Sequence, residues 1–200
     1  MRFLALGDSY TIGEGVPEPA RWPMVLARQL RDDGCAIDDP YIVAVTGWTT
    51  DELAAGMDAA TFAPPYDLVT LLIGVNNQYR GRDADNYRIA FRALLARAIA
   101  LAGGRAGHVL VVSIPDWGVT RFAHENGNDS ARVAAAIDAF NAAAHAEAEQ
   151  AGARWADITA TSRRCGDAPD MLADDGLHPS ARQYALWLPS ILPPARAIVR

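Results

Sequence analysis

The sequence predicts an α/β protein in which a five-stranded parallel sheet lies between layers of helices. Short apolar runs alternate along the chain with stretches of helical periodicity, and such alternation is typical of a parallel sheet with right-handed crossovers. The run "DLVTLLIG" is apolar at nearly every position, which indicates a strand buried on both faces. With 200 residues and 50% hydrophobic composition, the chain is large enough for one sizeable core, so we expect a single domain over residues 1–200.

Five short runs are the predicted strands. They are apolar, several are rich in β-branched residues, and turn-forming residues follow most of them. The predicted strands are residues 2–6, 41–45, 67–74, 108–114 and 153–158.

The segments between these runs have the spacing of helices. Apolar residues three and four positions apart predict helices over residues 20–31, 50–60, 87–99 and 131–151. Asp129 or Ser130 is suited to cap the start of the fourth, and Gly103–Gly104 ends the third. A last helix begins near Pro179, which is a favourable first helical residue, and is expected to end at Pro193–Pro194.

Composition excludes several functions. The net charge is −6 and no basic run is present, so a nucleic-acid partner is not expected. The apolar runs are shorter than the ~20 residues that span a bilayer, and the N-terminal run is too short for a signal peptide, so we predict a cytoplasmic protein. All 18 basic residues are arginine, and without lysine the chain has no Walker-type phosphate loop.

Residues that can carry chemistry follow the predicted strands. In a parallel α/β fold, ligands bind outside the carboxyl ends of the strands. Ser9 follows the first strand, and a serine hydroxyl becomes a nucleophile when a base takes its proton. His178, in "DDGLHP", is the candidate base, and Asp175 is placed to orient its imidazole, with Asp174 as the alternative carboxylate.

Three groups at the same edge are candidates for an oxyanion hole. Glycine lets a backbone approach a ligand closely, so the N–H of Gly47 is suited to donate to a developing oxyanion. The side-chain amide of Asn76 and the N–H of Ser9 are the other two candidate donors. The histidine, cysteine and carboxylate spacings that bind a metal ion are lacking, and no metal is expected.

Four separated motifs together resemble the SGNH hydrolases, also known as the GDSL esterases and lipases. "GDSY" carries Ser9, "VTGWTT" carries Gly47, "IGVNNQ" carries Asn76, and "DGLHP" carries Asp175 and His178, in the family's order over residues 7–179. The resemblance implies a three-layer α/β/α flavodoxin-like fold, a serine nucleophile and no cofactor. It further implies a carboxylic ester hydrolase that acts through a Ser-His-Asp triad and an acyl-enzyme on a small-molecule ester.

The motifs depart from the family pattern at two positions. Tyr10 stands where the family usually has leucine, and Asn77 stands where it usually has aspartate. Asn77 keeps the size of aspartate without its charge, so any anchoring of neighbouring loops by that position is expected to be weaker here. Candidates for a substrate pocket are four aromatic residues at the strand ends, with packing beneath the loops as the alternative: Tyr10, Trp48, Tyr79 and Trp117.

Two further functions remain open at this stage. One is an acyltransferase that uses the same triad to pass the acyl group to a sugar or alcohol. The other is a non-catalytic flavodoxin-like binding module, although a phosphate-binding glycine-rich loop is lacking. Arg80 and Arg82 are interpreted as solvated loop charges, with a clamp for an anionic substrate as the alternative.

Overall fold

A computed structural model describes residues 1–199. Its centre is one sheet of five parallel strands in the order β2-β1-β3-β4-β5. This confirms the predicted α/β class and the five-stranded parallel sheet. The strands are β1 (Phe3–Gly7), β2 (Tyr41–Ala44), β3 (Leu68–Leu72), β4 (Val109–Val112) and β5 (Arg154–Ala156).

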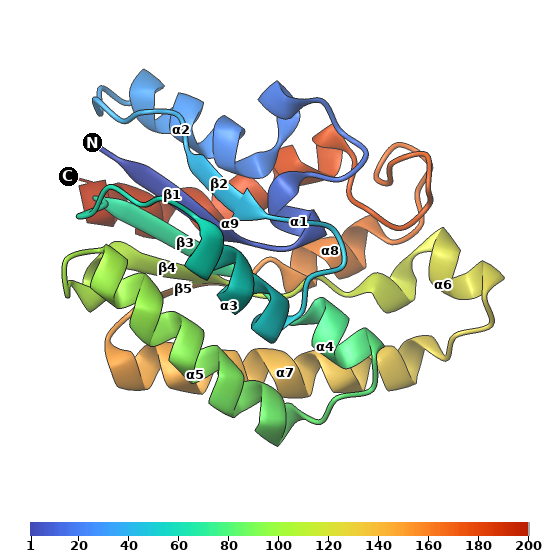
Figure 1. The fold of residues 1–200 in the computed structure, drawn as a ribbon. Helices are drawn as coiled ribbons and strands as arrows, with labels where there is room; N and C mark the ends of the chain where they lie inside the picture. Colours follow the sequence, from blue (N-terminus) through green and yellow to red (C-terminus); the bar gives the residue numbers. More distant parts are fainter. Residues whose placement is uncertain (200) are drawn as a thin grey trace.

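Helices cover both faces of the sheet. On one face, α2 packs against α9, and on the other, α5 packs against α3 and α7 (Figure 1). The long helices are α2 (Trp22–Asp32), α3 (Thr50–Ala59), α5 (Ala84–Leu101), α7 (Ser130–Ala151) and α9 (Ala181–Val199). The three-layer α/β/α arrangement follows, because each apolar helix stripe is buried against a sheet that has no exposed face of its own.

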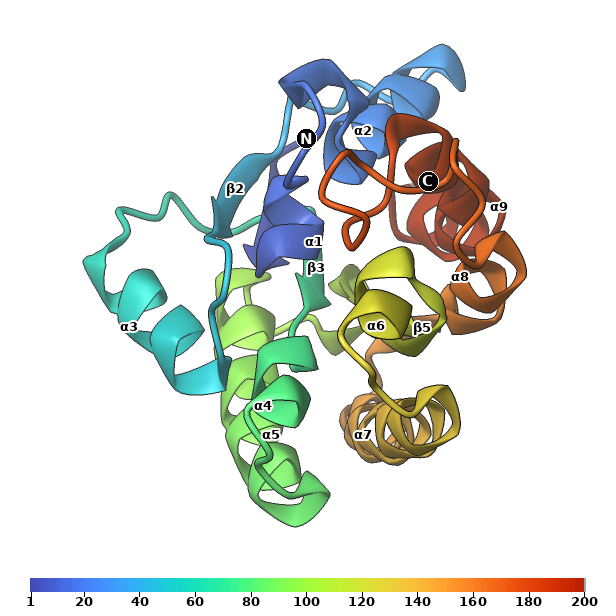
Figure 2. The same ribbon diagram turned by 90° about the vertical axis from the view of Figure 1, so that its right-hand side faces the viewer.

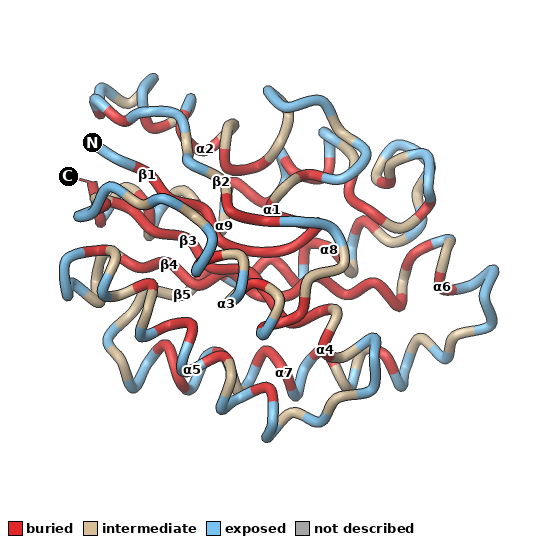
Figure 3. The backbone as a smooth tube through the Cα atoms, viewed as in Figure 1, coloured by how far each residue is buried: buried red, intermediate tan, exposed pale blue. Residues whose placement is uncertain are grey.

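The burial pattern agrees with a core centred on the sheet. Every residue of β1, β3 and β4 is buried, and the edge strands β2 and β5 are partly exposed (Figure 3). Among the described residues, no helix is both long and apolar enough to cross a membrane. The cytoplasmic location stays a prediction.

The strand order creates one favoured binding edge. From β1 the chain moves outward to β2, returns past β1 to β3, and then proceeds through β4 to β5. The order therefore reverses between β1 and β3, and loops that leave these two strands diverge to opposite sides of the sheet. Figure 2 looks onto the carboxyl ends of the strands, where α1 and α4 follow β1 and β3.

The structure also contains short helices, most of them at this edge, that the sequence does not predict. They are α1 (Ser9–Ile12), η1 (Glu18–Ala20), α4 (Val75–Tyr79), η3 (Trp117–Val119), α6 (Arg121–Glu125) and α8 (Thr159–Cys165), while η2 (Ala106–His108) lies at the opposite edge. A helix of one or two turns has too few residues to show a periodic apolar stripe, so the sequence carries no strong signal for it.

The last helix does not end at Pro193–Pro194, as the sequence predicts, but continues to Val199. Pro189 and Pro193 lie on the exposed side of the helix, where water can replace the hydrogen bonds that a proline removes. The opposite side buries Ile191, Ile198 and Val199. Burial of each such side chain stabilises the fold by about 1.5–3 kcal/mol, which offsets the lost hydrogen bonds.

Candidate active site

Ser9 is the first residue of α1, and only Asp8 separates it from the end of β1. The turn is tight because Gly7 lets the backbone come close: a Cβ atom there would lie 2.4 Å from the carbonyl oxygen of Leu72 on β3. Asp8 caps the short helix, and its Oδ1 accepts the Tyr10 N–H at 3.1 Å. Asp8 therefore holds the turn that presents Ser9.

The Asp8 carboxyl group is fully buried. Burial raises its pKa to about 7, although the backbone amides of Tyr10, Asp8 and Gly74 act in the opposite direction. Its Oδ2 atom has no hydrogen-bond partner among the described residues. An uncompensated carboxylate in this position is costly, so the protonated form is favoured well above the usual pH range of an aspartate.

His178 is paired with Asp175 in the segment before α9. The Nδ1 atom of the imidazole lies 2.6 Å from Asp175 Oδ2, and Asp175 Oδ1 accepts the backbone N–H groups of Leu177 and His178 at 2.9 and 3.0 Å. Burial raises the pKa of Asp175, but these hydrogen bonds outweigh it and leave the pKa below the usual value. Asp175, rather than the alternative Asp174, therefore orients the ring.

The imidazole of His178 lies near the turn that carries Ser9. Its ring packs against Tyr10, with ring centroids 5.7 Å apart, and Tyr10 in turn packs against Trp187 of α9 at 6.4 Å. Tyr10 is buried, so the residue that replaces the family leucine packs behind the histidine. Within residues 1–199, no hydrogen bond joins Ser9 to His178.

Gly47 lies in the loop between β2 and α3, and other segments bind that loop. Its φ angle is +86°, a left-handed conformation that favours glycine. The guanidinium of Arg80 donates to the Gly47 carbonyl oxygen at 2.7 Å, and the Thr46 hydroxyl donates to Glu14. Sequence analysis did not identify Arg80 and Glu14 as positioning residues, because the contacts join segments about 30 residues apart.

Two adjacent asparagines on α4 reach the same loop. Asn76 Nδ2 donates to the Trp48 carbonyl oxygen at 2.9 Å, which leaves the second hydrogen of the amide for another acceptor. Asn77 is fully buried and forms two hydrogen bonds with Thr50, the first residue of α3. The uncharged Asn77 thus anchors the loop through both its oxygen and its nitrogen.

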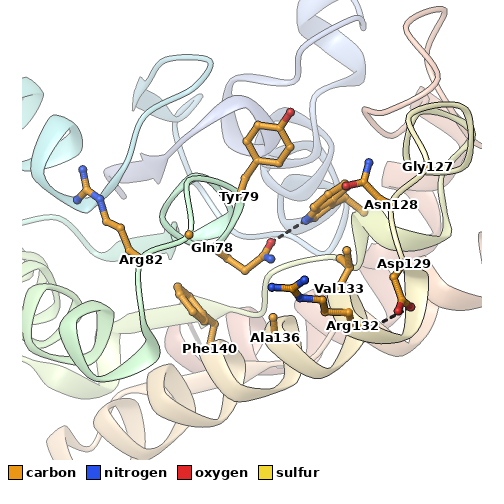
Figure 4. A pocket seen from close by; sticks show the side chains of 12 residues that line it. Gln78, Tyr79, Arg82, Gly127, Asn128, Asp129, Arg132, Val133, Ala136 and Phe140 are labelled. Carbon is orange, nitrogen blue, oxygen red and sulfur yellow. Dashed lines mark hydrogen bonds between the residues drawn. The ribbon is translucent and has the colours of Figure 1, made fainter.

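Of the four aromatic residues predicted to line a substrate pocket, two border a cavity of about 520 Å³ (Figure 4). They are Tyr79 and Trp117. Their rings meet edge to face at 5.3 Å, and the Trp117 indole donates to Gln78 at 2.8 Å. Trp117 also borders a second, very small cavity that Tyr10 lines. Trp48 instead packs on α3. Its indole lies so close to Gly56 that a Cβ atom added at that glycine would be only 2.2 Å from the ring.

Arg80 and Arg82 are paired with carboxylates of α3. Arg80 lies 3.3 Å from Glu52, and Arg82 lies 2.5 Å from Asp51. The hydrogen bond from Arg82 is the main cause that lowers the pKa of Asp51 to about 2. These two arginines are therefore more than solvated loop charges, because they hold the turn after α4 against the start of α3.

The arrangement defines a class of protein: a doubly wound α/β/α fold of flavodoxin-like topology, with a serine, a histidine–carboxylate pair and an asparagine amide around its switch point. Residues 5–186 match the model of the GDSL-like Lipase/Acylhydrolase family, and the chain belongs to this family. This confirms the family that the four motifs indicate.

Solved structures show the same fold. The chain is similar to TesA, with 21% identity, TM-score 0.77 and 99% of each chain covered. It is also similar to the acetylxylan esterase Axe2 from Geobacillus stearothermophilus, with 19% identity, TM-score 0.73, and 97% of this chain and 93% of that chain covered. A third is the psychrotrophic esterase EstA from Pseudoalteromonas sp., inhibited by monoethylphosphonate, with 16% identity, TM-score 0.72, and coverage of 98% and 97%. No curated protein matches the sequence.

Proposed function

We propose that the protein is a serine esterase that hydrolyses carboxylic esters through an acyl-enzyme. Membership of a lipase/acylhydrolase family supports the reaction class. The observation that carries the proposal is the pairing of His178 with Asp175 at 2.6 Å, with the imidazole packed on the residue next to Ser9.

In the proposed mechanism, Ser9 attacks the ester carbonyl carbon while the Nε2 atom of His178 accepts the hydroxyl proton. Asp175 holds the Nδ1–H tautomer and stabilises the imidazolium that forms. The imidazolium then protonates the leaving alcohol, which departs and leaves the acyl group on Ser9. Water, deprotonated by His178, attacks the acyl-enzyme and releases the carboxylic acid.

The tetrahedral intermediate carries a negative oxygen that needs hydrogen-bond donors. The proposed donors are the N–H groups of Ser9 and Gly47 and the second hydrogen of the Asn76 amide. The contacts from Arg80 and Asn77 support this assignment, because they hold the Gly47 loop and α3 against α4. Donors that are fixed before the reaction stabilise the transition state without a cost of reorganisation.

Labelling by a fluorophosphonate tests the nucleophile directly. We expect one covalent adduct on Ser9, and we expect Ser9→Ala to abolish both the adduct and the hydrolysis of short-chain aryl esters. Ser190→Ala, on α9, is the matched control and should react as the wild type. That EstA is described as inhibited by monoethylphosphonate supports the choice of a phosphorus probe. An adduct on another residue, or turnover by Ser9→Ala, would contradict the assignment.

Hydrolysis and acyl transfer share the acyl-enzyme and differ in the acceptor. Product analysis with an added alcohol distinguishes them. We expect free carboxylic acid as the main product; a dominant new ester would favour the acyltransferase. The flavodoxin-like binding module predicts no turnover and no adduct.

A further inference from the structure

The cavity beside Tyr79 and Trp117 contains an arginine that no carboxylate neutralises. Arg132, in the first turn of α7, extends into the cavity over Ala136 (Figure 4). No ion pair to its guanidinium exists within residues 1–199. Arg82, the other arginine that lines the cavity, forms an ion pair with Asp51. The carboxylate of Asp129 accepts the backbone N–H groups of Ala131 and Arg132 and caps α7.

The rest of the lining combines polar residues, among them Gln78, Asn128 and Asp129, with an apolar wall. Val133, Ala136 and Phe140 form one side along α7, and Tyr79 lies across from them (Figure 4). Trp117 also lines the cavity and packs on Tyr79. A volume of about 520 Å³ lies in the range of small-molecule sites. A guanidinium beside apolar walls suits a ligand that combines a hydrocarbon part with a carboxylate, because the planar fork of arginine binds a carboxylate through two parallel hydrogen bonds.

The cavity lies beside α4, the helix that carries Asn76. Tyr79 lies one helical turn after Asn76 on α4. Trp117 borders this cavity and also the very small cavity lined by Tyr10, whose ring packs on His178. Ser9, Asn76 and His178 do not line this cavity, so a substrate with its ester at Ser9 would enter it only with its distal part, alongside α4.

We infer that Arg132 selects esters that carry a carboxylate at a distance from the ester bond, a specificity that rests on the proposed esterase function. The carboxylate would accept hydrogen bonds from the Arg132 guanidinium, while the chain between the two groups contacts Phe140 and the aromatic pair. A charge-assisted bond in a partly apolar site discriminates against the uncharged analogue.

Matched pairs of esters test this specificity. The first pair compares the 4-nitrophenyl monoester of adipic acid with 4-nitrophenyl hexanoate, which places the charge on the acyl side. The second compares 4-carboxyphenyl acetate with phenyl acetate, which places it on the leaving group. We expect wild-type kcat/KM to favour the charged ester by about tenfold in one of the pairs, and the preference to decline with salt because it is electrostatic.

Substitution of the arginine should remove the preference and leave hydrolysis of the neutral ester intact. We expect Arg132→Gln to lower kcat/KM for the charged ester by about tenfold and to change the neutral ester by less than about twofold. Arg132→Glu should reverse the preference. Arg28→Gln, an exposed arginine of α2, makes the same change in net charge and should have no effect.

The result separates this inference from the esterase proposal. Ser9-dependent hydrolysis of the neutral esters, without a preference for either charged ester, would overturn the role of Arg132 alone. Absence of both turnover and a fluorophosphonate adduct would overturn the esterase. Calorimetric binding of the charged and neutral esters to Ser9→Ala protein, with and without Arg132→Gln, gives a readout that needs no turnover. Equal affinity of both esters would also overturn the inference.

Discussion

Asn77 and Thr50 are joined by two hydrogen bonds across the site. Asn77 Oδ1 accepts the Thr50 backbone N–H at 3.0 Å, and Asn77 Nδ2 lies 2.7 Å from Thr50 Oγ1. Both side chains are buried, so neither group has ready access to water as a substitute partner. The pair fastens the start of α3 to α4, and the Gly47 loop lies between β2 and this attachment.

Asn77→Ala should therefore destabilise the fold by about 2–3 kcal/mol, because it leaves two buried groups of Thr50 without partners. Urea unfolding measures the loss. Thr50→Val removes the hydroxyl but keeps the backbone N–H, so it should cost less. In the double variant, the two losses should not add, because both substitutions remove the same bond. Additive losses would contradict a direct coupling between these residues.

Asn76→Ala tests the oxyanion hole apart from the nucleophile. A donor that acts mainly on the transition state affects kcat more than KM, and loss of one such donor costs roughly 10²–10³-fold in kcat. The bond to the Trp48 carbonyl is also lost, so a decrease of about 1 kcal/mol in stability should accompany it. Steady-state kinetics and thermal melting measure the two effects.

Asn86→Ala, in the exposed first turn of α5, is the control for the removal of an amide near this edge. Fluorophosphonate labelling of Asn76→Ala should continue at a lower rate, because Ser9 and His178 remain. A kcat within about threefold of the wild type would remove Asn76 from the proposed hole.

Asp175→Asn should lower kcat by about 10²–10⁴-fold, because an amide cannot stabilise the imidazolium and can hold the ring in the wrong tautomer. Asp174→Asn makes the same chemical change one residue earlier, where the structure shows a backbone contact with Arg121 and no bond to His178. It should retain nearly full activity. Equal losses of kcat in the two variants would show that activity depends on the conformation of this segment and not on the Asp175 carboxylate.

Asp8→Asn should make stability less dependent on pH. The folded-state pKa of Asp8 is raised from 3.8 to about 7, so its protonation stabilises the fold fully below pH 3.8, and this contribution is lost as the pH rises through about 7. Between about pH 5 and 8, the wild type should lose about 2–3 kcal/mol more free energy of unfolding than Asp8→Asn. Urea unfolding at both pH values measures this difference. Parallel changes in the two proteins would show that Asp8 does not titrate in this range.

The alternation of strand and helix patterns was sufficient to predict the parallel sheet, because a period of 2 or 3.6 residues is local information that a single segment carries. The same patterns placed Ser9 and Asn76 at strand ends, and the spacing in "DDGLHP" brought Asp175 within reach of His178. These are short-range relationships, and the structure keeps each of them.

Tertiary structure alone decided which distant groups meet. Three features depend on how α3, α4 and α7 are placed at one edge of the sheet. They are the hydrogen bond from Arg80 to Gly47, the ion pair of Arg82 with Asp51, and the guanidinium of Arg132, which has no ion-pair partner among the described residues. The continuation of α9 past its prolines depends likewise on an apolar face packed against α2. Such contacts arise from strand order and helix packing, and residues far apart in the chain carry no local periodicity that records them.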